Sequence, residues 1–257
     1  MPKLEKLEKS RGVVIFANNT DEINFVEIAK ANAKLIKRYT GLPTTIVSND
    51  AAPNQRFSTD TNQFIEWKNK GRFGVYECSP YDETILLDAD YLILEDSLNA
   101  VFSTNFDYRL INKNIYITDP KVVETMGPRG LPFVWATAVF FRKTEKTQQF
   151  FQLVSRIQTN YRYYAALYNI QQNNYRNDYA FAIAHYILSG NTENMSQYIP
   201  WPLITVNGPI THLELSGSQL IVKAADRAWI LPQCNLHVMS KMYLQSDNFR
   251  DFVNNAT

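Results

Sequence analysis

The stretch "ETILLDADYLILED", residues 83–96, decides how the chain is read. An apolar run, 85–87, ends at Asp88-Ala89-Asp90, and the chain then becomes apolar again. Alternate residues of an extended strand point to the same side, so the carboxylates of Asp88 and Asp90 share a face. Carboxylates that close repel each other, and burying one without a partner is costly. Either the two acids are solvated at a strand end, or they share a cation such as Mg²⁺, Mn²⁺ or Ca²⁺, which prefer oxygen ligands.

The chain before this stretch reads as a strand, a helix and a second strand. Residues 12–19 form a short apolar run, 20–41 carry apolar residues at helical spacing, and 42–50 are again strand-like. Thr20 is predicted to cap the helix and Gly41 to end it. Such a unit gives a parallel pair of strands, and ligands bind beyond the carboxyl ends of such strands. The polar residues expected at that edge are Asn18, Asn19, Ser48, Asn49 and Asp50.

The chain after this stretch continues the alternation of strands and helices. Residues 134–143 are predicted to form a strand, and residues 144–168 and 176–190 are predicted to form helices. After Pro200 the pattern is β-like, with a hairpin over 211–223. The sequence therefore predicts an α/β fold with one mixed, mainly parallel sheet flanked by helices and a small C-terminal β-hairpin region.

Composition narrows the class of protein. The chain has 257 residues, 45% hydrophobic and 20% charged, with a net charge of +1, which is typical of a soluble globular protein without an overall basic field. Cys78 and Cys234 lack a CxxC partner, which indicates reduced thiols in a cytoplasmic protein. The start "MPKLEKLEKSRG" has no apolar segment of a signal peptide, and no run is long enough for a transmembrane helix. We expect residues 1–11 to be a charged tail or helix and 12–257 a single domain.

Three further residues have side chains suited to a metal or phosphate site. His237 lies in a short β run between apolar neighbours, where a neutral imidazole suits Mn²⁺, although a hydrogen-bonded core histidine fits the same pattern. Lys241, four residues later, is either a phosphate ligand or a surface lysine. Asp178 lies in the first turn of a predicted helix, where the helix dipole already favours an acid. His185 and His212 have no comparable context and are expected to be structural.

The segment "PYDETILLDADYLILEDSLNAVF" resembles the DxD region of retaining glycosyltransferases with the GT-A fold, of the glycogenin and lipopolysaccharide galactosyltransferase kind. Three later segments match that family in order: "VWATAVFF", "RNDYAF" and "NLHVMSK". The resemblance extends over most of the chain, and the chain is also similar to bacteriophage proteins of this type. Two positions depart from the family pattern. The interval from His237 to Lys241 is shorter and lacks glycine, and Asn177-Asp178 stands where Asp-Gln is usual.

The resemblance implies a metal-dependent transferase that takes a sugar from a nucleotide-diphosphate sugar, most simply a UDP-sugar, with retention of configuration. It implies a cation, Mn²⁺ or Mg²⁺, held by Asp88, Asp90 and His237. It places the donor near Asn18, Asn19, Asp50, Arg72, Asp88, Ala89 and Lys241. It makes Arg176, Asn177 and Asp178 the catalytic candidates, with the acid near the reacting sugar and Arg176 holding acceptor or phosphate. The acceptor stays open between a glycan, a protein and a modified DNA base, and a viral member would work in the host cytoplasm.

Two other functions fit the same pattern. The first is a GT-A-like module that binds a nucleotide or glycan without turnover. The second is a sugar nucleotidyltransferase, which would need a glycine-rich phosphate loop that "ANNTDEIN" (17–24) lacks. The Arg- and Tyr-rich run 155–176 resembles a nucleic-acid surface, but packing of an amphipathic helix is the favoured explanation.

Overall fold

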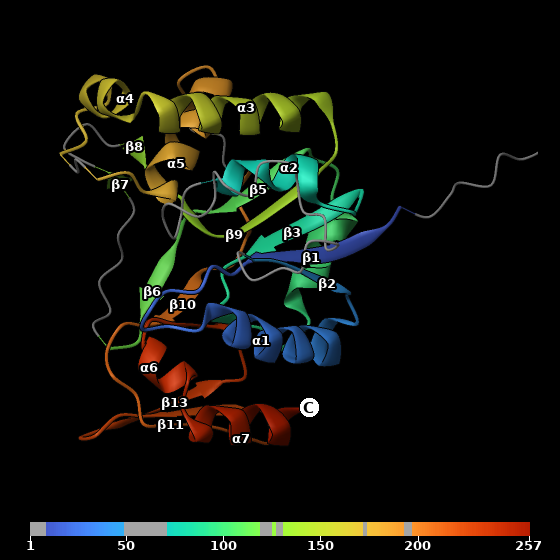
Figure 1. The fold of residues 1–257 in the computed structure, drawn as a ribbon, viewed down its shortest axis with the longest axis vertical. Coiled ribbons are helices and arrows are strands. Elements are labelled where there is room, and N and C mark those ends of the chain that lie inside the picture. Colours follow the sequence, from blue (N-terminus) through green and yellow to red (C-terminus); the bar gives the residue numbers. More distant parts are fainter. Residues whose placement is uncertain (1–8, 49–70, 119–124, 127–130, 172–173, 193–196) are drawn as a thin grey trace, which may run out of the picture.

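The computed structural model describes residues 9–48, 71–118, 125–126, 131–171, 174–192 and 197–257 (Figure 1). Its centre is a five-stranded sheet in the order β2-β1-β3-β9-β5. The strands are β1 (Arg11–Phe16), β2 (Thr44–Val47), β3 (Glu83–Leu87), β5 (Tyr108–Ile111) and β9 (Trp135–Arg142). Strand β9 runs antiparallel to both of its neighbours, and the other pairs are parallel. The predicted mixed, mainly parallel α/β sheet is confirmed.

Helices cover both faces of this sheet (Figure 1). Helix α1 (Phe25–Thr40) lies on one face, and α3 (Glu145–Thr159) and α5 (Asn177–Leu188) lie on the other. The remaining helical segments are short: η2 (Arg72–Gly74), α2 (Val75–Cys78), η3 (Ser97–Ser103), α4 (Tyr161–Leu167), α6 (Lys241–Leu244) and α7 (Asp247–Ala256). Within the described residues, none of the helices has the length and apolar character needed to cross a bilayer.

A second sheet, which the sequence did not predict, stands beside the first. It has the order β4-β14-β10-β6, built from β4 (Tyr91–Leu92), β6 (Asn114–Tyr116), β10 (Leu203–Val206) and β14 (Leu236–Val238). The expectation of a single sheet is therefore wrong. These strands are only two to four residues long, and they come from four separate parts of the chain, so no local pattern marks them as partners.

Two smaller sheets complete the structure. The predicted hairpin is confirmed as β11 (His212–Ser216) and β12 (Gln219–Lys223), and β13 (Ala228–Pro232) extends it to three antiparallel strands. Strands β7 (Thr125–Met126) and β8 (Leu131–Pro132) form a short ribbon. The domain division stays a prediction, although Arg11, placed in the tail, is the first residue of β1.

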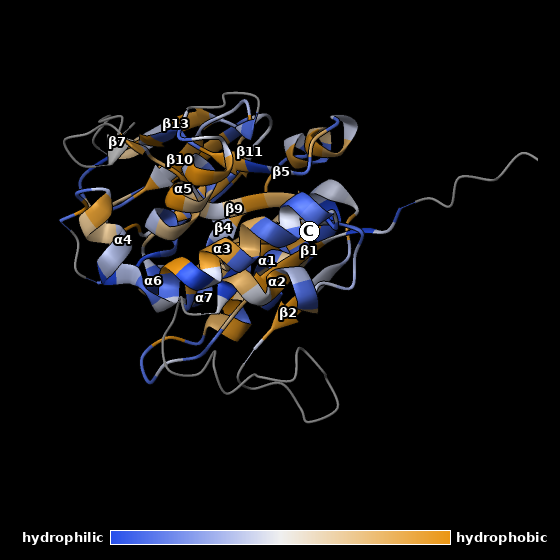
Figure 2. Ribbon diagram, turned by 90° about the horizontal axis from the view of Figure 1, so that it is seen from above, coloured by the Kyte–Doolittle hydropathy of each residue, from blue (hydrophilic) through white to orange (hydrophobic). Residues whose placement is uncertain are grey.

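The core explains why the long apolar strands lie at the centre. Every residue of β3 is buried, and β9 is buried from Trp135 to Phe141. In Figure 2, much of β9 is orange, in the middle of the molecule. Beneath α3, Tyr108 stacks on Phe150 with ring centroids 4.3 Å apart. A sheet that is apolar on both faces needs helices on both, which is the arrangement observed.

Two predicted helix boundaries were wrong. Helix α1 begins at Phe25 and not at Thr20, because the side chain of Asn24 caps it by accepting from Glu27 N, 3.1 Å away. The predicted helix 144–168 breaks at Asn160, whose φ and ψ of −115° and 34° are not helical, so α3 ends there and α4 begins. The predicted end at Gly41 is confirmed: its φ is +74°, a conformation that glycine adopts without steric cost.

Candidate functional site

The second sheet brings His237 to the acidic pair. Strand β14 pairs antiparallel with β4, immediately after Asp90, and Val238 N donates to Asp90 O at 2.9 Å. The Nε2 atom of His237 lies 3.6 Å from Asp90 Oδ2. Asp88, Asp90 and His237 each offer one ligand atom, and these atoms lie within 4.8 Å of one another. Residues almost 150 positions apart in the sequence thus form one cluster, as the sequence analysis predicted.

Hydrogen bonding fixes which nitrogen of His237 is available. Thr205 Oγ1 donates to Asn114 Oδ1 at 2.7 Å, so it accepts from His237 Nδ1, which lies 3.2 Å away. The proton therefore sits on Nδ1, and the lone pair of Nε2 faces Asp90. Burial lowers the pKa of His237, against the opposing charges of Asp88 and Asp178, which favours the neutral ring. A neutral imidazole held through its other nitrogen is the usual form of a metal-ligating histidine.

Each carboxylate of the pair also contacts a cationic side chain. Arg72 Nη1 pairs with Asp88, and Arg72 Nη2 donates to Ala136 O at 2.8 Å. Lys241 Nζ pairs with Asp90 and donates to Val238 O at 3.2 Å. Two negative charges are thereby balanced by two positive charges, which explains how the acids tolerate each other at a buried strand end. The sequence analysis placed both cations near the donor phosphates and did not foresee their contacts with the acids.

A buried amide that sequence reasoning missed holds the turn between the acids and β4. Asn32 of α1 is fully buried, donates to Tyr91 O at 2.7 Å and accepts from Ile93 N at 3.2 Å. It therefore supplies hydrogen bonds to backbone groups that the short strand leaves unpaired. The signal was available, because Asn32 is a polar residue on the apolar face of α1, next to Ala29 and Ile36.

A cavity of about 430 Å³ opens at these side chains, beyond the carboxyl end of β3. Asn18, Arg72 and Ala89 line it, as do all three residues of the acid–imidazole cluster. Asn19 does not line it, since its Oδ1 accepts from Val26 N at 3.0 Å and so supports the first turn of α1. Asp50 lies outside the described residues.

The three residues predicted near the reacting sugar line the same cavity. Asp178, in the first turn of α5, accepts from Ala136 N at 2.9 Å through Oδ1 and from Arg176 Nη2 at 2.9 Å through Oδ2. Asn177 Oδ1 accepts from Tyr175 Oη at 2.9 Å. Burial raises the pKa of Asp178, although Arg176 and the Ala136 amide oppose this. The backbone of Ala136 contacts both Arg72, which pairs with Asp88, and Asp178 of α5. It therefore connects the acidic pair to the α5 side of the cavity.

Two aromatic residues of this cavity were also missed. Trp135, at the start of β9, and Tyr116, at the end of β6, line its wall. Trp135 stood inside "VWATAVFF", which the resemblance matched to the family's strand on the acceptor side without giving this residue a role, and Tyr116 lies on a three-residue strand of the second sheet. Neither position carries a local signal of a binding role.

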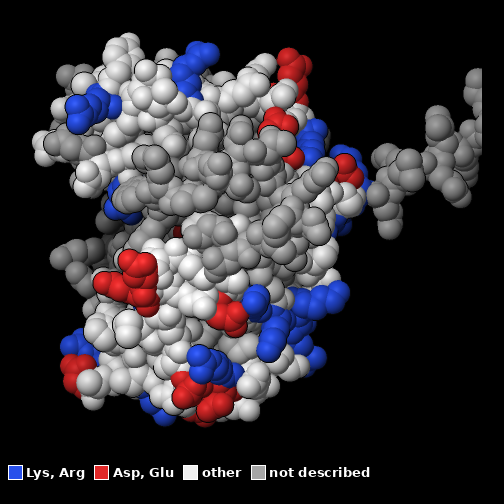
Figure 3. All heavy atoms as spheres, viewed as in Figure 1, with Lys and Arg blue, Asp and Glu red and all other residues white. Residues whose placement is uncertain are grey.

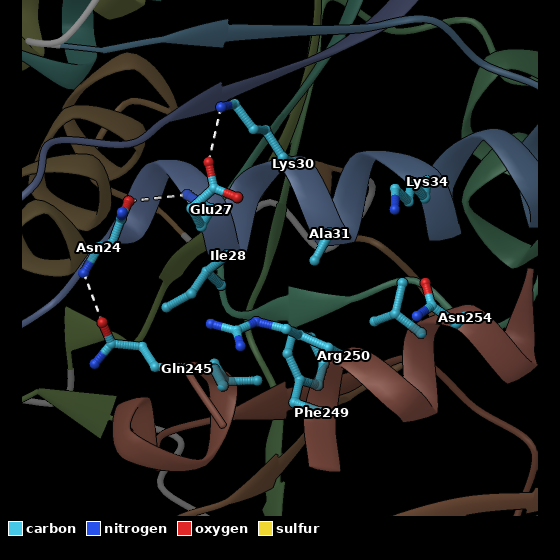
Figure 4. Close-up of a pocket in the computed structure, with 12 residues that line it drawn as sticks. Asn24, Glu27, Ile28, Lys30, Ala31, Lys34, Gln245, Phe249, Arg250 and Asn254 are labelled. Carbon is cyan, nitrogen blue, oxygen red and sulfur yellow. Dashed lines mark hydrogen bonds and ion pairs between the residues drawn. The ribbon is translucent and has the colours of Figure 1, made fainter. Parts of the chain in front are cut away.

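A second cavity, of about 570 Å³, lies between α1 and α7 (Figure 4). Ile28 and Ala31 point toward Phe249 and Arg250 across it, and Lys30 pairs with Glu27 at 2.8 Å. Lysine and arginine side chains gather on the neighbouring surface of α1 (Figure 3). Within the described parts of the chain, the metal-type cluster lies only in the first cavity, so we place the candidate site there.

Comparisons with known proteins give only distant likenesses. No family model matches the chain, and no curated protein matches it. Among solved structures, an active-site mutant of LgtC is 13% identical, with a TM-score of 0.45, over 68% of this chain and 70% of that one. The glycosyltransferase GlyE of Streptococcus pneumoniae TIGR4 is 12% identical, with a TM-score of 0.38, over 74% of this chain and 45% of that one. A glycosyltransferase involved in glycosylation of the major capsid of PBCV-1 is 11% identical, with a TM-score of 0.35, over 73% of this chain and 80% of that one. At TM-scores below 0.5 these likenesses carry no argument about function.

Proposed function

We propose that the chain is a metal-dependent glycosyltransferase with a GT-A-like fold that uses a nucleotide-diphosphate sugar, most simply a UDP-sugar. One observation carries the proposal: Asp88, Asp90 and His237 converge in a cavity at the carboxyl end of the central sheet. Ligands of open α/β sheets bind at that edge. Sequence resemblance to retaining GT-A enzymes supplies the reaction class and the expectation of retention.

The donor atoms fit a resident divalent cation. Two carboxylates and one neutral imidazole suit Mn²⁺, and Mg²⁺ fits less well because it prefers oxygen. Asp88, Asp90 and His237 would hold the cation, which would supply positive charge to neutralise the leaving nucleoside diphosphate. His237 is oriented for this by Thr205, and Asp90 is fixed by the backbone bond from Val238.

Lys241 and Arg72 have a second task in this proposal. Both contact the acids, and both line the cavity that would hold the diphosphate. An incoming diphosphate offers each of them phosphate oxygens in place of carboxylate oxygens. The two cations then stabilise the same leaving group from the protein side, which is electrostatic stabilisation by pre-placed charges.

The α5 side of the cavity would hold the sugar. The carboxylate of Asp178 is fixed by the Ala136 amide and by Arg176, so it can accept hydrogen bonds from sugar hydroxyls in a defined position. Asn18 and Ala89 line the opposite part of the cavity, where the base and ribose would lie. The acceptor would enter from the remaining side.

Release of UDP from UDP-glucose, UDP-galactose and UDP-N-acetylglucosamine, with and without Mn²⁺, tests the proposal. We expect release from one donor only when Mn²⁺ is present, and a loss of about a hundredfold or more in Asp90→Asn. Asp251→Asn, which removes an exposed acid of α7, should match the wild type.

Three results would contradict the proposal in different ways. Release of UDP that does not depend on Mn²⁺ would contradict a metal-dependent reaction. Stabilisation of the fold by UDP with Mn²⁺, without any turnover, indicates a binding module. Pyrophosphate release from UTP and a sugar 1-phosphate indicates a nucleotidyltransferase.

A further inference from the structure

The candidate cavity has aromatic walls on two sides of the acidic pair. Strand order places β3 between β1 and β9, so the acids that follow β3 lie between the ends of those two strands. Phe16 lines the cavity from the β1 side, and Trp135 lines it from the β9 side. With the donor nucleotide on the β1 side and its sugar at Asp178, the aromatic wall formed by Trp135 and Tyr116 has no assigned ligand.

The position of Tyr116 follows from the second sheet. Thr205 pairs in register with His237 on one neighbouring strand and with Tyr116 on the other. Paired residues of adjacent parallel strands point to the same side, and strands lie about 4.8 Å apart. The backbone of Tyr116 therefore lies about 10 Å from that of His237, a distance that accommodates a sugar ring beyond the cation site.

Four side chains form what we call the aromatic corner: Tyr116, Trp135, Arg176 and Asp178. The rings of Tyr116 and Trp135 are nearly perpendicular, at 75°, with centroids 6.2 Å apart. Phe133 packs on Trp135 with a centroid distance of 4.5 Å, which holds the indole in place. Burial raises the pKa of Tyr116, and the positive charge of Arg176 opposes this.

Two donors in this wall lack acceptors among the described residues. Trp135 Nε1 and Asn177 Nδ2 are sealed from water, and neither has a hydrogen-bond partner there, although both residues line the cavity. A buried N–H without an acceptor is unfavourable. Because both atoms are sealed, either N–H can bond to a ligand in the cavity only if a side chain of the wall moves.

Given the proposed function, on which this inference rests, we propose that the aromatic corner binds the acceptor and that the acceptor is a pyranoside sugar. A pyranose presents a C–H face to an aromatic ring and hydroxyls that both donate and accept. Arg176 and Asp178, 2.9 Å apart, offer both functions side by side, and because Asp178 would also contact the donor sugar, the pair lies where the two sugars meet. A nucleic-acid acceptor fits poorly, because Asp178 neutralises Arg176 and leaves the corner no excess positive charge for phosphates.

Saturation-transfer NMR on the whole chain with Mg²⁺ and UDP tests this assignment. The probes are methyl β-D-galactopyranoside, methyl α-D-glucopyranoside, adenosine and N-acetyltyrosinamide. We expect saturation of the ring protons of at least one pyranoside and a Kd about tenfold weaker in Tyr116→Leu and Trp135→Leu. Tyr116→Phe keeps the ring and should bind within about twofold of the wild type.

The Kd for UDP with Mg²⁺, measured in the same samples, separates the two proposals. If Tyr116→Leu binds UDP with the same Kd as the wild type, the fold and the donor site of the variant are intact. Three results would then overturn the acceptor assignment alone. They are absence of pyranoside binding, pyranoside binding as tight in both leucine variants as in the wild type, and a preference for adenosine or N-acetyltyrosinamide. Failure of UDP to bind to the wild type overturns the proposed function as well.

Discussion

Replacing Lys241 by methionine should change metal binding and nucleotide binding in opposite directions. In the structure the ammonium of Lys241 pairs with the carboxylate of Asp90, so it competes with a cation for the same oxygen. With a diphosphate present, the same ammonium would instead favour binding. Lys241→Met should therefore tighten binding of Mn²⁺ alone and weaken binding of UDP in the presence of Mn²⁺.

The size of the effect follows from the burial of the pair. The side chains of Lys241 and Asp90 are only 26% and 10% exposed, so solvent screens their interaction only partly. A hydrogen bond between charged groups contributes about 1.5–3 kcal/mol. Mn²⁺ alone should then bind about tenfold to a hundredfold more tightly to the variant. UDP, having lost one cationic partner, should bind about tenfold more weakly to the Mn²⁺-loaded variant.

Titration of free Mn²⁺ by electron paramagnetic resonance measures the first affinity, and calorimetry with UDP at saturating Mn²⁺ measures the second. Lys34→Met, which removes an exposed lysine of α1, is the matched control and should change neither. Weaker or unchanged binding of Mn²⁺ alone to Lys241→Met would refute the competition between lysine and cation.

Three further predictions concern the support of the site and the pH dependence of the fold. Asn32→Leu removes two hydrogen bonds to buried backbone groups and should lower the free energy of unfolding by about 2–5 kcal/mol, measured by urea denaturation. Thr205→Val leaves Nδ1 of His237 without its partner and should weaken Mn²⁺ binding about tenfold in the same resonance assay. It also removes the donor to Asn114 Oδ1, so it should lower the free energy of unfolding by about 1–3 kcal/mol. Burial lowers the pKa of His185 to about 4, so the unfolded chain binds a proton there that the folded chain does not. The free energy of unfolding should then decrease by about 3 kcal/mol as pH falls from about 6.5 to about 4, and His185→Leu should remove that part of the slope in urea titrations at successive pH values.

The parts of the fold that the sequence predicted are those with strong local patterns. The apolar run of β3 ending at Asp88, and the helix ended by Gly41, are marked by periodicity and by a residue whose conformation is distinctive. Thr20 was predicted to cap the helix. In the structure its hydroxyl instead accepts from Ile23 N and closes a turn that precedes the helix. A local pattern cannot distinguish these two uses of the same side chain.

The acid–imidazole cluster was predicted from the resemblance to GT-A enzymes, which joined His237 to the acids, whereas the local patterns alone left other roles open. Two acids follow a buried strand, and His237 lies in a short apolar run. What the sequence could not provide was the second sheet, whose register aligns Tyr116, Thr205 and His237 across three strands from distant segments. The hydrogen bond that orients the imidazole depends on that register, as does the aromatic corner.

The charge partners of the acids were equally beyond sequence reasoning. Arg72 and Lys241 lie 16 and 151 positions from the carboxylates that they contact. An isolated arginine or lysine in a sequence is usually a solvated surface residue. Only the fold, which brings Arg72 to Asp88 and Lys241 to Asp90, gives these two a role in the site.

The central claim is that Asp88, Asp90 and His237 together hold one divalent cation on which a nucleoside diphosphate docks. A crystal soaked with Mn²⁺ and UDP, measured at a wavelength where manganese scatters anomalously, tests it most directly. The account predicts an anomalous peak about 2.0–2.3 Å from a carboxylate oxygen of each aspartate and from His237 Nε2, with UDP phosphate oxygens on its open side. A peak bound elsewhere, or UDP bound in the cavity with no peak between these three residues, would contradict it.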